Sequence, residues 1–240
     1  MKTYLAVIAL TALAIGSSRA QIISQWNFDS LTLSSTAGAT PVVTGGSLAP
    51  DIGTGLASAT HSSTATVYST PSGNDSAKAF SSNHWAIGDY YQFQTATTSF
   101  SNIHIGFFHN SSSTGPGAFK LQYSTDGTTF TDVTGGAYTI PASVSWTPTT
   151  YSASTVFYFD LSSISAINDL SAVYFRLTDT STTSVGGGTV ATTGTSRVDQ
   201  FTVSQGSVDI APVPEPGTVA MIALGLGVAL FSIRRRRTMA

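Results

Sequence analysis

The chain has 240 residues, few charges and no cysteine, which excludes a disulfide framework, thiol catalysis and thiolate metal sites. Between its two hydrophobic ends, the chain has four Lys or Arg residues and eleven Asp. The resulting net charge of about −7 argues against nucleic acid as a partner. The roughly 190 residues between the ends suit one all-β domain.

The N-terminal residues have the pattern of a secretory signal peptide. Lys2 supplies a positive charge, and residues 5–15 are apolar or small. Ala20 closes a short stretch of the kind that signal peptidase recognises. We therefore predict a signal peptide over residues 1–20, with signal peptidase cutting between Ala20 and Gln21.

The first part of the exported region gives few structural signals. Residues 22–28 alternate polar and apolar side chains, which predicts a first strand. Residues 31–83 are rich in Ser, Thr, Gly and Ala, with three prolines. We expect short edge strands at 42–43 and 65–68, and loop over the rest.

The middle of the chain alternates clearly. Two strands are predicted over residues 89–94 and 102–108, because every second side chain is large and apolar. A hairpin follows, with strands at 119–123 and 128–133. Residues 124–127 form its turn and include Asp-Gly, a strong hairpin signal between two alternating runs.

Three more strands complete the predicted domain. They cover residues 156–161, 172–178 and 197–203, and a helical turn is expected at 164–170. Roughly eight short strands without a long amphipathic helix are typical of an antiparallel sandwich. We predict an all-β antiparallel β-sandwich of the jelly-roll type over residues 21–210, in which the first and last strands are neighbours.

The tail has three parts in a fixed order: a proline-containing motif, an apolar segment and an arginine cluster. The motif is Val213, Pro214, Glu215, Pro216 and Gly217. The cluster is Arg234, Arg235, Arg236 and Arg237. The apolar segment at 217–233 is just long enough for a ~30 Å bilayer core, so we predict a transmembrane helix whose arginines stay cytoplasmic.

This arrangement at residues 211–237 resembles the PEP-CTERM sorting signal. The resemblance implies an exosortase as processing enzyme, a single-pass or transient membrane intermediate, and a final location at the cell surface or in the exopolysaccharide matrix. The segments 113–127 and 197–203 also resemble a pattern of exported bacterial jelly-roll domains that precede such tails, which implies the same fold and destination.

Catalytic signals are weak. No Gly-x-Ser-x-Gly elbow occurs, and the domain offers only aspartates for the paired carboxylates of a glycosidase. His104 and His109 fall on opposite faces of one strand, which makes them a poor metal pair. We expect them at the surface or rim, and His61 and His84 to be isolated. The sequence therefore predicts no enzyme.

A structural calcium ion is the one cofactor considered. Oxygen ligands suit Ca²⁺, and Asp29 and Asp199 come together if the first and last strands are neighbours. The alternative is that Asp199 pairs with Arg197 or Arg176 while Asp29 caps a turn.

Sugar binding would need exposed aromatic rings beside amides or carboxylates. Five residues are candidates because they are outward by strand parity or lie in loops. They are Trp85, Tyr90, Phe108, Trp146 and Tyr174.

Together these patterns predict an exported, non-enzymatic protein with a structural or adhesive role. A carbohydrate-binding module for exopolysaccharide is the alternative, and it requires a patch of exposed aromatics. A glycoside hydrolase would require a cleft with paired Asp. An ice-binding surface would require a regular Thr array, which the Thr-rich segments near 147–150 and 180–183 do not sustain.

Overall fold

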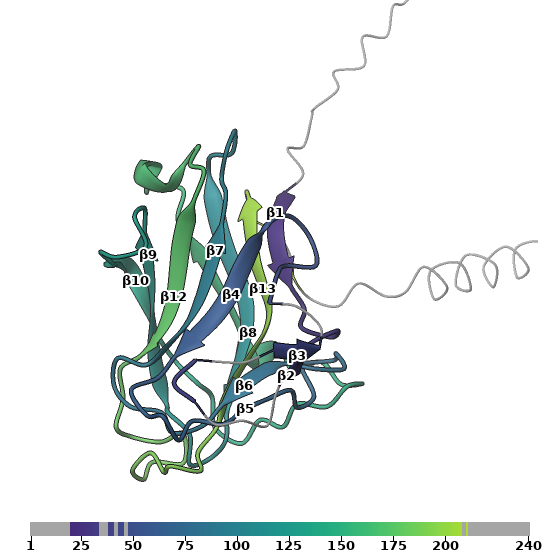
Figure 1. The fold of residues 1–240 in the computed structure, drawn as a ribbon, viewed down its shortest axis with the longest axis vertical. Helices are drawn as coiled ribbons and strands as arrows, with labels where there is room; N and C mark the ends of the chain where they lie inside the picture. Colours follow the sequence, from purple (N-terminus) through teal and green to yellow (C-terminus); the bar gives the residue numbers. More distant parts are fainter. Residues whose placement is uncertain (1–19, 34–37, 41–42, 46–47, 208–209, 211–240) are drawn as a thin grey trace, which may run out of the picture.

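The structure is a computed structural model that describes residues 20–33, 38–40, 43–45, 48–207 and 210. Strands make up almost all of its regular structure, and they form two antiparallel sheets packed face to face (Figure 1). The predicted all-β sandwich is therefore confirmed. The predicted signal peptide, apart from Ala20, and the predicted segment 211–237 lie outside the described residues.

One sheet has six strands. Its order is β11-β8-β13-β6-β5, and β1 pairs with β13 beside β6. The strands are β1 (Gln21–Trp26), β5 (Tyr68–Ser69), β6 (Phe80–Ser82), β8 (Ile103–Ser111), β11 (Val156–Asp160) and β13 (Ser196–Gln205). The pairing of β1 with β13 confirms that the first and last strands are neighbours.

The other sheet has five strands, in the order β10-β9-β12-β7-β4. They are β4 (Gly55–Thr60), β7 (Tyr90–Thr95), β9 (Ala118–Ser124), β10 (Thr131–Thr139) and β12 (Val173–Asp179). A separate pair is formed by β2 (Thr32–Leu33) and β3 (Val43–Gly45), and two short 3₁₀ turns cover Ala153–Thr155 and Ser165–Ile167. The predicted hairpin and helical turn are both present.

The core lies between the sheets because alternate side chains of each strand point inward. The inward positions on β7 and β12 are fully buried, as are those on β8 and β13. Aromatic and branched apolar residues dominate this layer. They include Trp26, Tyr91, Phe93, Ile105, Phe107, Phe119, Leu121, Phe175, Leu177, Phe201 and Val203.

Three strands lie where mainly loop was expected. They are β2, β4 and β6, and all fall in the segment that is rich in small residues. On β4 the inward side chains are only Ala57 and Ala59, while Leu56 is 52% exposed on the outside. The usual large-inside pattern is therefore absent, which explains why this strand gave no clear signal in the sequence.

Ile210, beyond the end of β13, lies against the six-stranded sheet. The backbone N–H of Ile210 donates to the hydroxyl of Tyr158 at 3.1 Å. The Ile210 side chain is buried in a small second cluster with Ala79, Phe108 and Trp146. The last described residue is thus packed against the outer face of this sheet.

Candidate functional site

The outer face of the five-stranded sheet carries half-buried polar and aromatic side chains. Register pairs Arg176 with Gln92 on one side and with Gln122 on the other. In the adjacent rows, Tyr90 pairs with Thr178 and Tyr174 with Gln94. Strand alternation therefore brings amides, aromatic rings and a cation onto one continuous surface.

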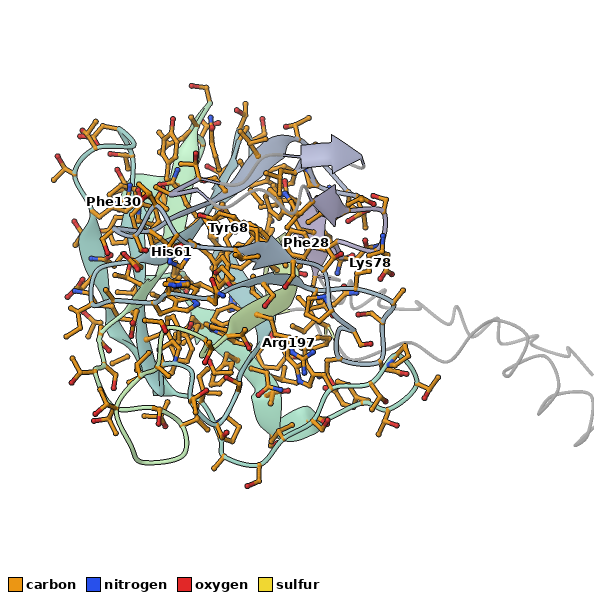
Figure 2. All side chains as sticks on the ribbon, turned by 60° about the horizontal axis from the view of Figure 1, so that its bottom comes forward. Phe28, His61, Tyr68, Lys78, Phe130 and Arg197 are labelled. Atoms are coloured by element: carbon orange, nitrogen blue, oxygen red, sulfur yellow. The ribbon has the colours of Figure 1, made fainter. Side chains whose placement is uncertain are left out.

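Arg176 is held between two aromatic rings at the centre of this face. Its Cζ lies 3.7 Å from the Tyr90 ring centroid and 3.4 Å from that of Phe130. Its Nε donates to Gln92 Oε1 at 2.8 Å. Phe130 comes from the segment between β9 and β10, at one edge of the molecule in Figure 2. These contacts fix the plane of the guanidinium group and the direction of its remaining N–H groups.

A chain of hydrogen bonds continues from β12 to β10. Thr178 Oγ1 donates to Gln122 Oε1 at 2.7 Å, and Gln122 Nε2 donates to Asp132 Oδ1 at 2.7 Å. Lys120 Nζ also donates to Asp132, at 3.0 Å from Oδ2. The hydrogen bonds from Lys120 and Gln122 hold the pKa of Asp132 below its usual range. The polar groups of this face are therefore ordered before any ligand arrives.

Tyr174 is positioned by the turn of the β9–β10 hairpin. Gly127 has φ +75°, and a Cβ added there would lie 2.9 Å from the Tyr174 ring. Asp126 fixes the same turn by accepting N–H bonds from Thr128 and Thr129, each at 2.8 Å. The turn thus packs closely against one part of the ring, and Tyr174 remains half-buried.

Tyr90 and Tyr174 are the two predicted sugar-contacting aromatics that lie partly exposed on this face. The expected exposure of the other three is wrong. Trp85, Phe108 and Trp146 are 6%, 1% and 4% exposed.

Each of the three is covered for a definite reason. Trp85 packs edge-on against Tyr91 in the core and donates its indole N–H to Ser82 O at 2.9 Å. Trp146 donates to Thr155 Oγ1 at 2.9 Å. The segment around Trp146 packs over Phe108, so the outward side of β8 is covered there.

The predicted calcium ligands do not form a metal site in the described residues, where no group of three or more His, Asp or Glu side chains is placed to hold an ion. Both Asp199 oxygens accept hydrogen bonds: Oδ2 from Ser76 Oγ at 2.6 Å and from Asn74 N–H at 3.1 Å, Oδ1 from Gln200 N–H at 2.7 Å. Burial raises the pKa of Asp199 to about 7, against the effect of these bonds.

The alternative pairings of the two aspartates are resolved as follows. Arg176 lies on the other sheet, so its expected pairing with Asp199 is wrong. Arg197 lies near enough to Asp199 for that carboxylate to act on the pKa of its guanidinium group, while its Nη1 donates to Ser72 O at 2.8 Å. Asp29 accepts the N–H of Lys78 at 2.9 Å and so fastens a loop. Hydrogen-bond donors of the chain thus contact both carboxylates.

His109 is buried although it was expected at the surface or rim, and His61 has close partners although it was expected to be isolated. His61 connects Asp89 to Ser82, with Nδ1 3.1 Å from Asp89 Oδ2 and Nε2 3.0 Å from Ser82 Oγ. His109 lies between the hydroxyls of Tyr138 and Ser196, and burial lowers its pKa to about 3.

The Asp89, His61 and Ser82 side chains have the order of a hydrolytic triad. All three residues are at most 3% exposed. Tyr91 also contacts Ser82, with its hydroxyl 3.1 Å from Ser82 Oγ. Burial works to raise the pKa of Asp89, but hydrogen bonds from His61 and two backbone N–H groups lower it below its usual value. The arrangement joins the ends of β4, β6 and β7 inside the sandwich.

Comparison with solved structures finds sandwiches of distant similarity. The carbohydrate-binding module TmCBM61, solved with beta-1,4-galactotriose, is 9% identical, with 63% of this chain and 88% of that chain covered and a TM-score of 0.36. The adhesin domain K2 of Lys-gingipain is 16% identical over 55% and 73%, with a TM-score of 0.30. The non-crystalline cellulose-specific module CBM28 is 12% identical over 56% and 78%, with a TM-score of 0.30.

At these identities no function is transferred from the solved structures, and no curated protein matches the sequence. Among the described residues, no helix is long and apolar enough to cross a bilayer. Residues 212–237 match the PEP-CTERM protein-sorting motif. The chain therefore carries a PEP-CTERM sorting motif, which indicates an exported protein that an exosortase processes and that is sorted to the cell surface or extracellular space.

Proposed function

We propose that this protein is a structural and adhesive component of the cell surface or extracellular matrix, and that it adheres by binding polysaccharide. The sorting motif at 212–237 supports the destination. The single observation that carries the binding role is Arg176, held between Tyr90 and Phe130 on the outer sheet face.

The chemistry of this face suits a polysaccharide that contains uronic acids. Aromatic rings offer apolar surface to a sugar ring, and ordered amides offer donors and acceptors to its hydroxyls. A guanidinium group with a fixed plane binds carboxylates with two parallel N–H bonds. Arg176 and Lys120 are two of the four cations between the hydrophobic ends of the chain, and Lys120 is paired with Asp132, so Arg176 supplies the positive charge that this face offers to a ligand.

The proposal includes no catalytic step. Glycoside hydrolysis needs a carboxylate pair that reaches substrate and water. Asp89 and Asp179 are close enough for the charge of Asp89 to raise the pKa of Asp179, but both are at most 3% exposed. The His61–Ser82 contact is equally buried. These buried positions support a binding role over a hydrolytic one.

The binding role can be tested by electrophoresis of the purified full-length chain in native gels that contain alginate. Arg176→Ala should lower the apparent affinity for alginate, measured from the retardation, at least about tenfold, because the fixed cation is lost. Tyr90→Ala should act in the same direction. Val67→Ala, 38% exposed and on another part of the surface, is the matched control and should bind normally.

Melting temperatures measured in parallel separate loss of binding from loss of folding. A wild-type chain that migrates equally with and without alginate, or an Arg176→Ala chain that is retarded like wild type, would refute the proposed binding face.

The destination has its own test. The intact mass of the protein is measured from membrane, surface and medium fractions of native cells, in the wild type and in a variant with Pro214 and Pro216 replaced by Ala. We expect the wild type to lose the mass beyond the motif and the variant to retain it. A wild type that keeps Arg234 to Arg237 and stays in the membrane would contradict matrix delivery.

A further inference from the structure

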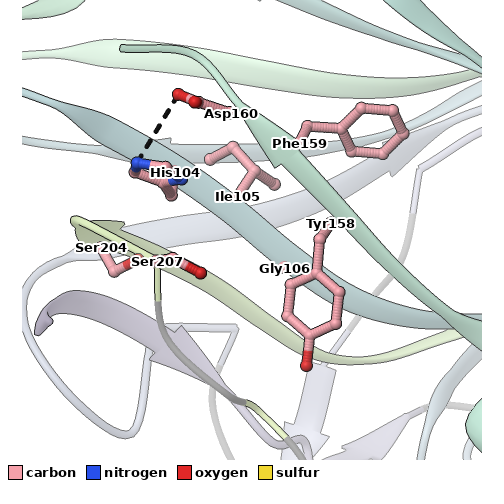
Figure 3. A pocket seen from close by; sticks show the side chains of 8 residues that line it. All are labelled: His104, Ile105, Gly106, Tyr158, Phe159, Asp160, Ser204 and Ser207. Carbon is pink, nitrogen blue, oxygen red and sulfur yellow. Dashed lines mark ion pairs between the residues drawn. The ribbon is translucent and has the colours of Figure 1, made fainter.

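We infer that the opposite side of the sandwich has a second saccharide site, a pocket of about 320 Å³ that takes one neutral sugar unit. The inference rests on the proposed polysaccharide-binding role and adds a separate site with a different ligand preference. The pocket lies on the outer face of the six-stranded sheet, where β11, β8 and β13 run side by side (Figure 3).

The floor of the pocket depends on Gly106. Register places Gly106 between Tyr158 on β11 and Thr202 on β13. A Cβ added at Gly106 would lie 3.2 Å from two carbons of the Tyr158 ring and 3.2 Å from Ile210 Cδ1. The Tyr158 ring and Ile210 therefore pack close over Gly106, and only a residue without a side chain lets the ring lie this near the floor of the pocket. Tyr158 is 49% exposed, so part of its surface is open to a ligand.

Hydrogen-bonding groups line the neighbouring row. His104 lies between Asp160 on β11 and Ser204 on β13 in register. Its Nε2 is 3.6 Å from Asp160 Oδ1, close enough for the two groups to bind adjacent hydroxyls of one ligand (Figure 3). Asp160 is held by the N–H of Ser162 at 2.8 Å and still exposes much of its side chain. Exposed Ser207 adds a hydroxyl at the rim.

Size and charge define the ligand class. The volume is at the lower end of the range for small-molecule sites, about 300 to 1,000 Å³, which suits one sugar ring rather than a long chain. An aromatic ring beside a carboxylate, an imidazole and hydroxyls suits a polyhydroxylated ring. No Lys or Arg is among the residues that line the pocket. The Asp160 carboxylate would repel a uronic acid, so a neutral sugar is favoured.

The two sites lie on opposite outer faces, because the pocket belongs to the six-stranded sheet and Arg176 to the five-stranded sheet. One molecule can therefore hold an acidic chain on one side and a neutral sugar unit on the other. Such a protein links two glycans without changing shape.

The test uses isothermal titration of the full-length chain with neutral hexasaccharides of glucose, galactose and mannose. At least one should bind. Tyr158→Ala should weaken that binding at least about tenfold, because the aromatic wall is removed. Gly106→Ala places a Cβ 3.2 Å from the Tyr158 ring and from Ile210, so it should displace the ring that forms the wall and weaken binding. Arg176→Ala should change it less than about twofold.

Separate readouts distinguish this inference from the proposed function. If Arg176→Ala abolishes alginate binding but no neutral hexasaccharide binds the wild type, the second site is refuted and the first stands. If a neutral hexasaccharide binds and Tyr158→Ala and Gly106→Ala leave its affinity unchanged, the pocket is not the binding site and the inference is refuted. If both variants lose binding of the neutral hexasaccharide, the second site is supported even if alginate is not bound.

Discussion

The rings of Phe93 and Phe201 stack across the interior, with centroids 3.6 Å apart and planes inclined by only 2°. Phe93 belongs to β7 of one sheet and Phe201 to β13 of the other. Trp26 packs edge-on against both rings, at 5.3 Å and 6.0 Å. The two sheets are therefore joined by a compact aromatic contact near the middle of the chain's longest strand.

Replacing Phe201 by Ala should lower the free energy of unfolding by about 3–5 kcal/mol, because a fully buried ring is lost and a cavity remains. Urea denaturation followed by tryptophan fluorescence measures this change. Ile87→Ala, at a residue 61% exposed, is the control and should alter stability by less than about 0.5 kcal/mol. Equal stabilities for the two variants would show that the stack is not a stability centre.

Asp199 predicts a pH dependence of stability. Burial raises its pKa to about 7 in the folded protein, while an unfolded Asp titrates near about 3.9. Between these values the folded state binds more protons than the unfolded state. The contribution of Asp199 to the free energy of unfolding therefore falls as pH rises from about 4 to about 7, by at most about 1.4 kcal/mol per pH unit. Above about pH 7 this contribution is constant.

Asp199→Asn removes this titration. We expect the unfolding free energy of the wild type minus that of the variant to fall as pH rises from about 4 to about 7, because only the wild type loses stability there. Denaturation curves across that range provide the measurement. A difference that stays constant with pH would show that Asp199 titrates at an ordinary value.

Gly73 lies where no side chain fits. A Cβ added there would approach Asp199 Oδ2 to 2.3 Å and Lys78 O to 2.7 Å. Gly73→Ala should therefore destabilise the protein by about 1–3 kcal/mol through overpacking. Gly188→Ala is the matched control, because the nearest atom to its added Cβ is 3.8 Å away. Thermal melting of both variants tests this, and equal melting temperatures would contradict it.

Arg176→Lys keeps the charge but loses the planar group that lies between Tyr90 and Phe130. We expect alginate binding to fall about as far as in Arg176→Ala, since an ammonium group neither stacks nor binds a carboxylate with two parallel N–H bonds. Gel retardation of the two variants gives the comparison. Full binding by the Lys variant would show that charge alone is recognised.

Much of the sandwich could be predicted from the sequence because large inward side chains alternate with outward ones on strands such as β7 and β12. The inward residues of β7, β12 and β13 are large, so period-two alternation located them to within a few positions. β4 could not be found in this way. Its inward residues are Ala57 and Ala59, because the bulky Trp26 packs near its start and leaves little room.

The candidate site was predicted only in part. Parity correctly placed Tyr90 and Tyr174 outside, but it assumes that one face of every strand meets solvent. That assumption failed at Phe108, since the segment around Trp146 covers it. The contact of Phe130 with Arg176 and that of His61 with Asp89 join residues 46 and 28 positions apart. Such contacts depend on strand order, which local patterns do not reveal.

The contact of Ile210 with Tyr158 sets the side of the domain from which the tail leaves. The sorting motif begins at residue 212, so only one residue separates it from a backbone that is bonded to the six-stranded sheet. Even fully extended, the chain from Ile210 to Pro214 reaches no more than about 14 Å. A covalent link made at this motif would be a short tether that leaves from the six-stranded sheet, so the pocket side would lie nearer the attachment point than the face that carries Arg176.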